Sequence, residues 1–343
     1  MEHKINNFIH RLSLGYRLYS KGINIRSIKH ILMAMVRRRF RKFSSPYSVL
    51  LGVTYNCQFH CRFCGVGGQR QAGQNFLLSD SEIRKLISEL ADLGVLHVCF
   101  TGGEPILRDG IFEFISYAAK RGMVVSMDSN GLEINNRNAA RLKRAGLTLV
   151  KVSLHSPDAS WHDNIVNFKG AFENAVSAVE NALSAGLACI FSTVITKGLM
   201  NNSGLYRLIS LGKYTGAMAL KIELPAFAGN LLQSEYDVFT EEELACVRKA
   251  CDFRFAYYSS VLSDFLKCSC LSKSNCYISP KGEVKTCMFL PLTFGNIKNE
   301  SFRDIWVRMI CNEIYNYSVS DCYGENKNFR EKYLLGDYSG KFS

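Results

Sequence analysis

Apolar segments of strand length alternate with amphipathic segments of helix length through the first two thirds of the chain. The apolar runs that are typical of buried strands are 47–55, 95–100, 123–128, 147–155, 188–196 and 217–225. The segments with helical spacing between them are 79–94, 111–122, 136–146, 172–187 and 203–214. This alternation predicts an α/β fold with parallel strands, in which six β–α units form a partial barrel similar to a TIM barrel.

Most of the residues with useful chemistry lie in the turns that follow the first four predicted strands. These turns are CQFHCRFC (57–64), TGGEP (101–105), SNG (129–131) and SLHSPD (153–158). Because the carboxyl ends of parallel strands meet at one edge of a barrel, we expect the four turns to lie together. The sequence therefore predicts the functional site at that edge.

The alternation stops near residue 226, and a cysteine-rich segment follows. We expect a helical stretch over 241–267 and then a hairpin, YISPKGEVKTCMF (277–289), that turns at Pro280–Gly282. This segment predicts a small C-terminal α+β domain. The predicted division is a helical segment at 1–46, a barrel domain at 47–231, the cysteine-rich domain at 232–322 and a polar tail at 323–343.

Composition and charge narrow the class of protein. The chain is 47% hydrophobic and 21% charged, which is typical of a globular protein. It has no apolar run of spanning length and no signal peptide, so we expect a cytoplasmic protein. The net charge is +12, and residues 25–43 form a predicted basic amphipathic helix. This helix either packs on the main domain with a solvated basic face or meets anionic lipid, phosphate or an acidic partner. No nucleic-acid-binding signature occurs, so we expect no nucleic-acid partner.

Two groups of cysteines indicate metal or cluster ligation, because a reducing compartment disfavours disulfides. In the first group, Cys57, Cys61 and Cys64 have the spacing C-x3-C-x2-C. Three thiolates can hold three irons of a [4Fe–4S] cluster and leave the fourth iron open to a ligand. A structural zinc ion would need a fourth protein ligand, and His60 is awkwardly placed for that role beside Cys61.

With Phe63, these three cysteines resemble the signature of the radical SAM superfamily, whose members use S-adenosylmethionine (SAM). The resemblance covers about residues 47–225. It implies that the backbone and side chain of the GGE motif meet the amino group of SAM, that three polar residues contact its ribose and carboxylate, and that Phe63 packs near the adenine. The GGE residues are Gly102, Gly103 and Glu104, and the polar residues are Ser129, Asn130 and Ser153. On their own, GGEP and SNG are also ordinary turns.

The same resemblance implies a reaction. The enzyme would cleave SAM reductively at the cluster to a 5′-deoxyadenosyl radical, which abstracts hydrogen from a substrate. It would need an electron donor such as flavodoxin or ferredoxin. Glu223, at the end of the sixth predicted strand, is a candidate catalytic residue at the same edge. It could equally be a surface carboxylate.

In the second group, Cys270-x11-Gly282-x4-Cys287 resembles the opening of a SPASM or twitch domain, which carries auxiliary [4Fe–4S] clusters. The predicted ligands are Cys270, Cys276, Cys287 and Cys322. Cys311 competes with Cys322, and Cys268 could replace Cys270. The later cysteine group of a full SPASM pattern is missing, so we expect one auxiliary cluster. A zinc ion on the same four cysteines is the alternative.

The substrate stays open between a peptide and a small natural-product intermediate, since SPASM and twitch relatives act on both. The auxiliary cluster would accept an electron or help to hold the substrate. Only 46 residues precede the first predicted strand, which disfavours a peptide-recognition domain there. The alternatives to this reading are a non-catalytic cysteine-rich zinc or cluster scaffold, and a radical SAM enzyme that acts on a lipid-linked substrate at a membrane surface through residues 25–43.

Overall fold

A computed structural model describes most of the chain. The described residues are 13, 16–17, 25–40, 45–67, 76–200, 203–225, 228–231, 239–252, 254–258, 273–316, 329 and 332. The cysteines predicted at 268, 270 and 322 lie outside these residues. Among the described residues, no helix combines the length and the apolar character that crossing a bilayer requires.

All described strands belong to one sheet with the order β10-β9-β8-β1-β2-β3-β4-β5-β6-β7. The barrel strands are β1 (Ser48–Thr54), β2 (His97–Gly102), β3 (Val124–Ser129), β4 (Leu149–Ser153), β5 (Ala188–Val194), β6 (Leu220–Glu223) and β7 (Ala256–Tyr258). The C-terminal strands are β8 (Asn275–Ile278), β9 (Glu283–Lys285) and β10 (Thr293–Asn296). From β8 to β7 every neighbouring pair is parallel, whereas β9 pairs antiparallel with both β8 and β10.

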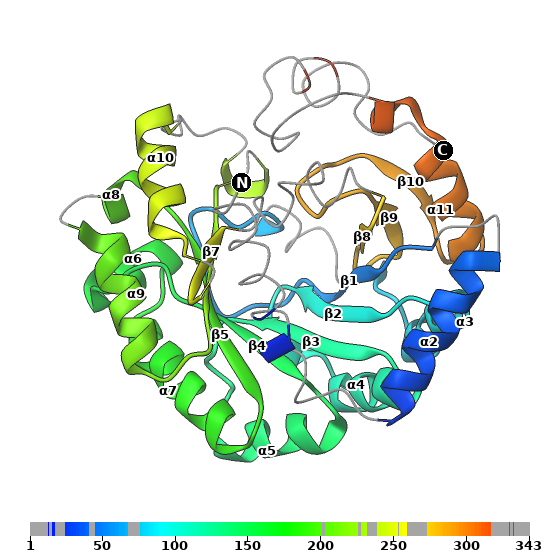
Figure 1. Ribbon diagram of the computed structural model, residues 1–343, viewed down its shortest axis with the longest axis horizontal. Coiled ribbons are helices and arrows are strands. Elements are labelled where there is room, and N and C mark those ends of the chain that lie inside the picture. The colour runs from blue at the N-terminus through cyan, green and yellow to red at the C-terminus, as the bar shows by residue number, and fades with distance from the viewer. Residues whose placement is uncertain are drawn as a thin grey trace.

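Helices cover the outside of the curved sheet, as Figure 1 shows. They are α2 (Ile25–Phe40), α3 (Asp80–Leu93), α4 (Ile111–Lys120), α5 (Asn136–Ala145), α6 (Ala159–Val166), α7 (Ala171–Ser184), α8 (Lys197–Met200), α9 (Gly204–Tyr214), α10 (Glu241–Ala250) and α11 (Phe302–Cys311). The start of α3 is set by a capping box between Ser79 and Glu82, and its end by Gly94 in the left-handed conformation. The predicted α/β fold with a barrel-like parallel sheet is confirmed.

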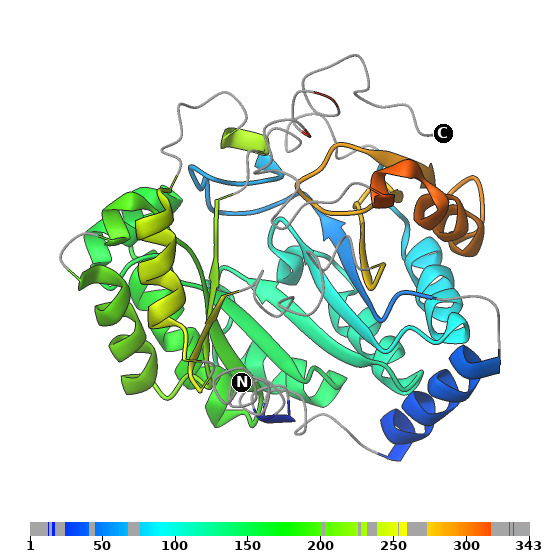
Figure 2. The ribbon, with the colours of Figure 1, turned by 45° about the horizontal axis from the view of Figure 1, so that its top comes forward.

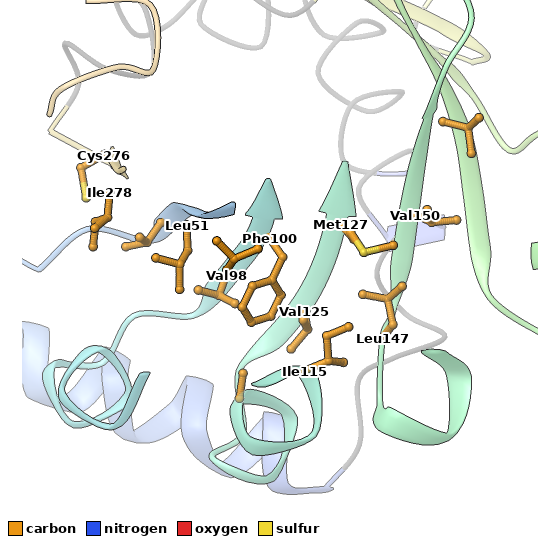
Figure 3. Packing of buried hydrophobic residues seen from close by; sticks show 14 of the residues in the cluster. Leu51, Val98, Phe100, Ile115, Val125, Met127, Leu147, Val150, Cys276 and Ile278 are labelled. Atoms are coloured by element: carbon orange, nitrogen blue, oxygen red, sulfur yellow. The ribbon is translucent and has the colours of Figure 1, made fainter. Parts of the chain in front are cut away.

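The two faces of the sheet differ in character because side chains alternate along each strand. The outer face packs against the helices and forms the main core, with residues such as Leu51, Phe100 and Met127 (Figure 3). The inner face has an apolar patch made of Leu149, Ala188, Ile190, Ala219 and Tyr257. The remaining inner positions are largely polar. The inner face of the barrel therefore carries hydrogen-bonding and charged groups that the apolar core lacks.

The structure changes two expectations about the C-terminal third. The predicted helix over 241–267 ends at Ala250, and Ala256–Tyr258 pairs with β6 as a seventh parallel strand. The aromatic residues of FRFAYY favour a strand there over a helix. The cysteine-rich segment also extends the barrel sheet itself, because β8 pairs directly with β1. Figures 1 and 2 accordingly place α11 beside α3.

The described residues of helix α2 that contact the rest of the chain include small and polar ones. Ser27 and Ala34 are buried, and His30 Nε2 lies 2.8 Å from the carbonyl oxygen of Val95. Five large apolar side chains of the helix are exposed to solvent: Ile25, Ile28, Leu32, Met33 and Val36. In Figure 2 the helix lies at the lower edge of the molecule.

Candidate functional site

The first cysteine group lies on the loop that follows β1. Cys57, Cys61 and Cys64 are partly exposed and are not in disulfides. The loop backbone is held by Asn230, whose side chain donates to the carbonyl of Cys61 at 2.9 Å and whose N–H donates to the carbonyl of Cys64 at 3.1 Å. In the described part of the chain no three His, Cys, Asp or Glu side chains are gathered into a metal-binding group. The loop therefore presents three thiols that do not surround a single metal ion, as is expected of ligands that each bind a different iron of a cluster.

The other side of this loop is anchored on α6, a helix that the sequence pattern did not reveal. Phe59 is buried against Ile165 and Val166, and its ring lies 4.7 Å from that of Phe168. The N–H of His60 donates to the carbonyl of Val166 at 3.0 Å. Packing and backbone hydrogen bonds therefore fix the loop while its thiols stay accessible.

The TGGEP turn lies directly against the end of β1. Gly102 has a φ of +127°, and a Cβ built there would lie 2.3 Å from the carbonyl oxygen of Thr54. A Cβ on Gly103 would lie 2.2 Å from the carbonyl oxygen of Asn56. The N–H groups of Gly103 and Glu104 donate to these same two carbonyls, both at 2.7 Å. Only glycine permits this approach, which ties the turn to the residue before Cys57.

The carboxylate of Glu104 joins the TGGEP turn to the SNG turn. It is fully buried and accepts hydrogen bonds from the N–H of Asn130 at 2.7 Å, from the Ser129 hydroxyl at 3.0 Å and from the N–H of Ile106 at 3.3 Å. Burial raises the pKa of Glu104 to about 7, although the three hydrogen bonds oppose this shift. Both carboxylate oxygens are thus engaged within the protein. This geometry makes Glu104 a residue that positions two turns.

The amide of Asn130 extends this network to the cysteine loop. Its Nδ2 donates to Gln58 Oε1 at 3.1 Å and lies 3.8 Å from Cys57 Sγ. Gln58 Nε2 in turn lies 3.4 Å from Glu133 Oε1. Three of the four predicted turns are therefore connected by hydrogen bonds. Sequence reasoning missed Gln58, because a residue between two cysteines gives no separate signal.

The fourth turn meets the cysteine loop through aromatic rings. Phe63 packs edge-on against His155 with ring centroids 4.6 Å apart. His155 Nδ1 accepts from the N–H of Val194 at 3.1 Å, and the N–H of His155 donates to His162 Nδ1 at 3.1 Å. Burial lowers the pKa of both histidines, so both rings are neutral near pH 7. Ser153, the last residue of β4 and the first of this turn, is half-buried. His155 was visible in SLHSPD, but nothing in the sequence indicated its contact with Phe63.

The predicted catalytic residue Glu223 lies on the inner face of the barrel at the end of β6. Its carboxylate pairs with Lys221 Nζ at 2.6 Å and accepts from the Ser192 hydroxyl at 3.1 Å. A second ion pair, between Lys151 and Asp128, joins atoms 2.6 Å apart. The Lys151 and Lys221 charges lower the pKa of Asp128, although burial opposes them. The interior therefore carries two cations and two anions that remain partly exposed to solvent.

The structure separates two of the predicted auxiliary ligands. Cys287 follows β9, is partly exposed, and its Sγ lies 3.5 Å from the N–H of Phe289. Cys276 is 1% exposed and points into the outer core beside Ile278 and Leu51, as Figure 3 shows. Burial raises the pKa of the Cys276 thiol, which disfavours the thiolate that a metal needs. This position speaks against the ligand role predicted for Cys276, because a strand sends alternate side chains to opposite faces.

The two cysteine loops meet around a group of buried hydroxyls. Gly65, next to Cys64, lies against the ring of Phe289, which a Cβ on Gly65 would approach to 2.9 Å. The hydroxyls of Tyr277 and Thr286 are buried, and neither has a hydrogen-bond partner among the described residues. Burial raises the pKa of Tyr277, and the nearby Tyr55 and Glu283 add to this effect. Unpaired buried donors beside a cysteine fit an acceptor group such as an iron–sulfur cluster.

Two family models match the chain. That of the radical SAM superfamily matches residues 51–203, and that of an iron–sulfur cluster-binding domain, SPASM, matches residues 268–333. The first range contains the cysteine loop and the three following turns, and the second contains Cys287. A radical SAM domain uses SAM and a [4Fe–4S] cluster, and a SPASM domain binds auxiliary iron–sulfur clusters.

Curated relatives and a solved structure extend this similarity over most of the chain. The AdoMet-dependent heme synthase of Nitratidesulfovibrio vulgaris is 27% identical over 284 residues, which cover 74% of this chain and 77% of the relative. The PqqA peptide cyclase of Methylocella silvestris is 24% identical over 282 residues, covering 77% and 75%. The fold resembles that of Streptococcus suis SuiB bound to its precursor peptide SuiA, with a TM-score of 0.67, 14% identity and coverage of 88% and 72%.

The geometry of Glu104 leads to a prediction. Glu104→Ala leaves the N–H groups of Asn130 and Ile106 without acceptors, so we expect the unliganded protein to lose about 2 kcal/mol or more. Glu104→Gln keeps an acceptor for Asn130, and its amide can donate to Ser129, so it should restore most of that stability. Urea unfolding and SAM-binding calorimetry measure both effects. A different outcome would contradict this role: Glu104→Gln weakens SAM binding as much as Glu104→Ala does, while both unliganded variants keep full stability. Glu104 would then act through the interaction of its charge with SAM.

Proposed function

We propose that this chain, a radical SAM enzyme with a C-terminal SPASM iron–sulfur domain, takes a hydrogen atom from a peptide substrate. The observation that supports the site most directly is the close approach of Gly102 and Gly103 to the end of β1, which holds the GGE turn beside the cysteine loop. The peptide class is supported by the PqqA peptide cyclase among the relatives and by the peptide-bound fold neighbour.

We propose that Cys57, Cys61 and Cys64 hold the first cluster. When bound, this reduced cluster and SAM supply a 5′-deoxyadenosyl radical that removes hydrogen from the substrate. The protein's part is to bind, orient and shield. The GGE turn presents backbone groups to SAM, with Glu104 holding the turn in place. Ser129, Asn130 and Ser153 are proposed to contact the ribose and carboxylate of SAM. Phe63, which packs against His155, is proposed to contact the adenine of SAM.

Glu223 is the proposed catalytic side chain on the inner face. Lys221 and the Ser192 hydroxyl each contact one of its two oxygens, so its carboxylate is held at the inner face. A carboxylate held in this way can bind an ammonium or amide N–H of a substrate or take a proton from it. We further propose that Cys287 holds an auxiliary cluster together with cysteines from 268–272 and 322, with Tyr277 and Thr286 as hydroxyl donors to it.

The loss of one thiol gives a direct test of the first cluster. Cys61→Ala removes one of three iron ligands, so the anaerobically reconstituted variant should lose about half of roughly eight irons per chain and all 5′-deoxyadenosine formation with dithionite. Cys246→Ala, at an exposed position on α10, is the matched control and should keep both. Full iron content and turnover in Cys61→Ala would refute the assignment of this loop.

Hydrogen transfer from labelled material distinguishes the two substrate classes. Cells of the source organism grown in deuterated medium are separated into a peptide fraction and a small-metabolite fraction, and each is incubated with the enzyme, SAM and reductant. We expect deuterium in 5′-deoxyadenosine, read by mass spectrometry, from the peptide fraction. Label that comes from the small-metabolite fraction alone would replace the peptide by a small natural-product intermediate.

The exposed apolar row on α2 supports a second role for this helix, because basic residues accompany it. We propose that Ile25, Ile28, Leu32 and Val36 contact the surface of an anionic membrane. Full-length protein should then sediment with vesicles that contain phosphatidylglycerol, and Val36→Asp should reduce the bound fraction several-fold. Val307→Asp on α11 is the matched control, since Val307 is also exposed. Equal sedimentation of all three proteins would rule out this contact.

A further inference from the structure

The cysteine loop is covered on several sides but open on one. Gly229 and Asn230 lie against the carbonyl side of Cys61 and Cys64, and the ring of Phe289 lies on Gly65. The inner side faces the amide of Asn130 and the GGE turn. Among the described residues, the outward side at His60 and Arg62 remains exposed. These two residues flank Cys61 directly.

A polar pocket of about 450 Å³ lies on this outward side and is lined by His60, Arg62, Asn164 and Asn167. Its walls are fixed by the protein itself. The backbone N–H groups of His60 and Arg62 donate to the carbonyls of Val166 and Ile165, each at 3.0 Å. The Arg62 guanidinium also donates to the side-chain oxygen of Asn164. The pocket is therefore preformed between the cysteine loop and the end of α6.

The chemistry of the pocket favours an anionic group. Its lining combines a guanidinium, an imidazole and two carboxamides, and none of the four residues is acidic. The neighbouring Asp163 is engaged elsewhere, because its carboxylate accepts from the N–H groups of Gly170 and Phe172. Lys169, two residues after Asn167 in the chain, is exposed and also positively charged. A guanidinium in a concave polar site is well suited to a carboxylate of a protein partner.

We infer that this pocket is the docking face for an acidic one-electron carrier protein of the flavodoxin or ferredoxin class, with a surface carboxylate of the carrier bound at Arg62. The inference rests on the proposed function in one respect, that the cysteine loop holds the first cluster. Electron tunnelling weakens steeply with distance, and no other part of the loop is as exposed in the described structure. The reduced carrier gives up one electron and the cluster gains it, and no bond or proton is exchanged.

The test compares two sources of electrons in the reconstituted holoenzyme. With photoreduced flavodoxin, Arg62→Glu should form 5′-deoxyadenosine about tenfold or more slowly, because like charges now meet at the docking face. With dithionite, a small reductant, the rate should be unchanged. Arg144→Glu is the control, since it makes the same charge change at the exposed C-terminal turn of α5. Raising the ionic strength should slow the flavodoxin reaction of the wild-type protein more than that of Arg62→Glu.

A second variant keeps the test valid if Arg62→Glu assembles its cluster poorly. Asn164→Asp lies on α6, outside the cysteine loop, and places a carboxylate against Arg62. It should also slow the flavodoxin reaction while sparing the dithionite reaction. If iron-loaded Asn164→Asp and Arg62→Glu match the wild-type rate with flavodoxin, the docking face lies elsewhere. If the wild-type protein makes no 5′-deoxyadenosine even with dithionite, the proposed function fails and the docking inference falls with it.

Discussion

The contact between two backbones at the end of β1 sets the geometry of the whole site. Gly102 and Gly103 bring the GGE turn so close to the carbonyls of Thr54 and Asn56 that any side chain would collide with them. The next residue, Glu104, then reaches from this turn to the start of the SNG turn. A carboxylate with 0% exposure is costly to bury, and three hydrogen bonds offset that cost. The position of one turn therefore fixes the positions of its neighbours.

The alternation of side chains along each strand divides the sheet into two environments. The outer face is apolar and packs against helices, while much of the inner face carries hydroxyls and two ion pairs. The same alternation places the side chains of two adjacent residues on β8 on opposite faces of the sheet. Cys276 enters the core, whereas Tyr277 lies near Tyr55 and Cys287 on the other face. In such a barrel the apolar outer face stabilises the fold, and the polar inner face is free to carry reactive groups.

The C-terminal segment does more than add a cluster site, because it completes the surroundings of the first one. β8 pairs with β1, the strand that leads into the cysteine loop, and Phe289 contacts Gly65 beside Cys64. The two cysteine loops are therefore neighbours, and one side of the first loop is covered. This covering leaves the side at His60 and Arg62 as the exposed side of the loop in the described structure.

The sequence by itself determined the alternation of the first six strands with their longer helices, the edge at which the turns gather and the resemblance to the radical SAM superfamily, since all three follow from local periodicity and from motifs contiguous in the chain. It did not reveal α6 or β7. Its helix over 241–267 was wrong at Ala256–Tyr258, because a short strand paired with β6 depends on a distant partner. Tertiary structure alone decided that Glu104 turns inward to Asn130, that Phe63 rests on His155 and that Cys276 lies in the core. Each of these three arrangements depends on contacts between residues that are far apart in the chain. The local sequence pattern does not predict such contacts.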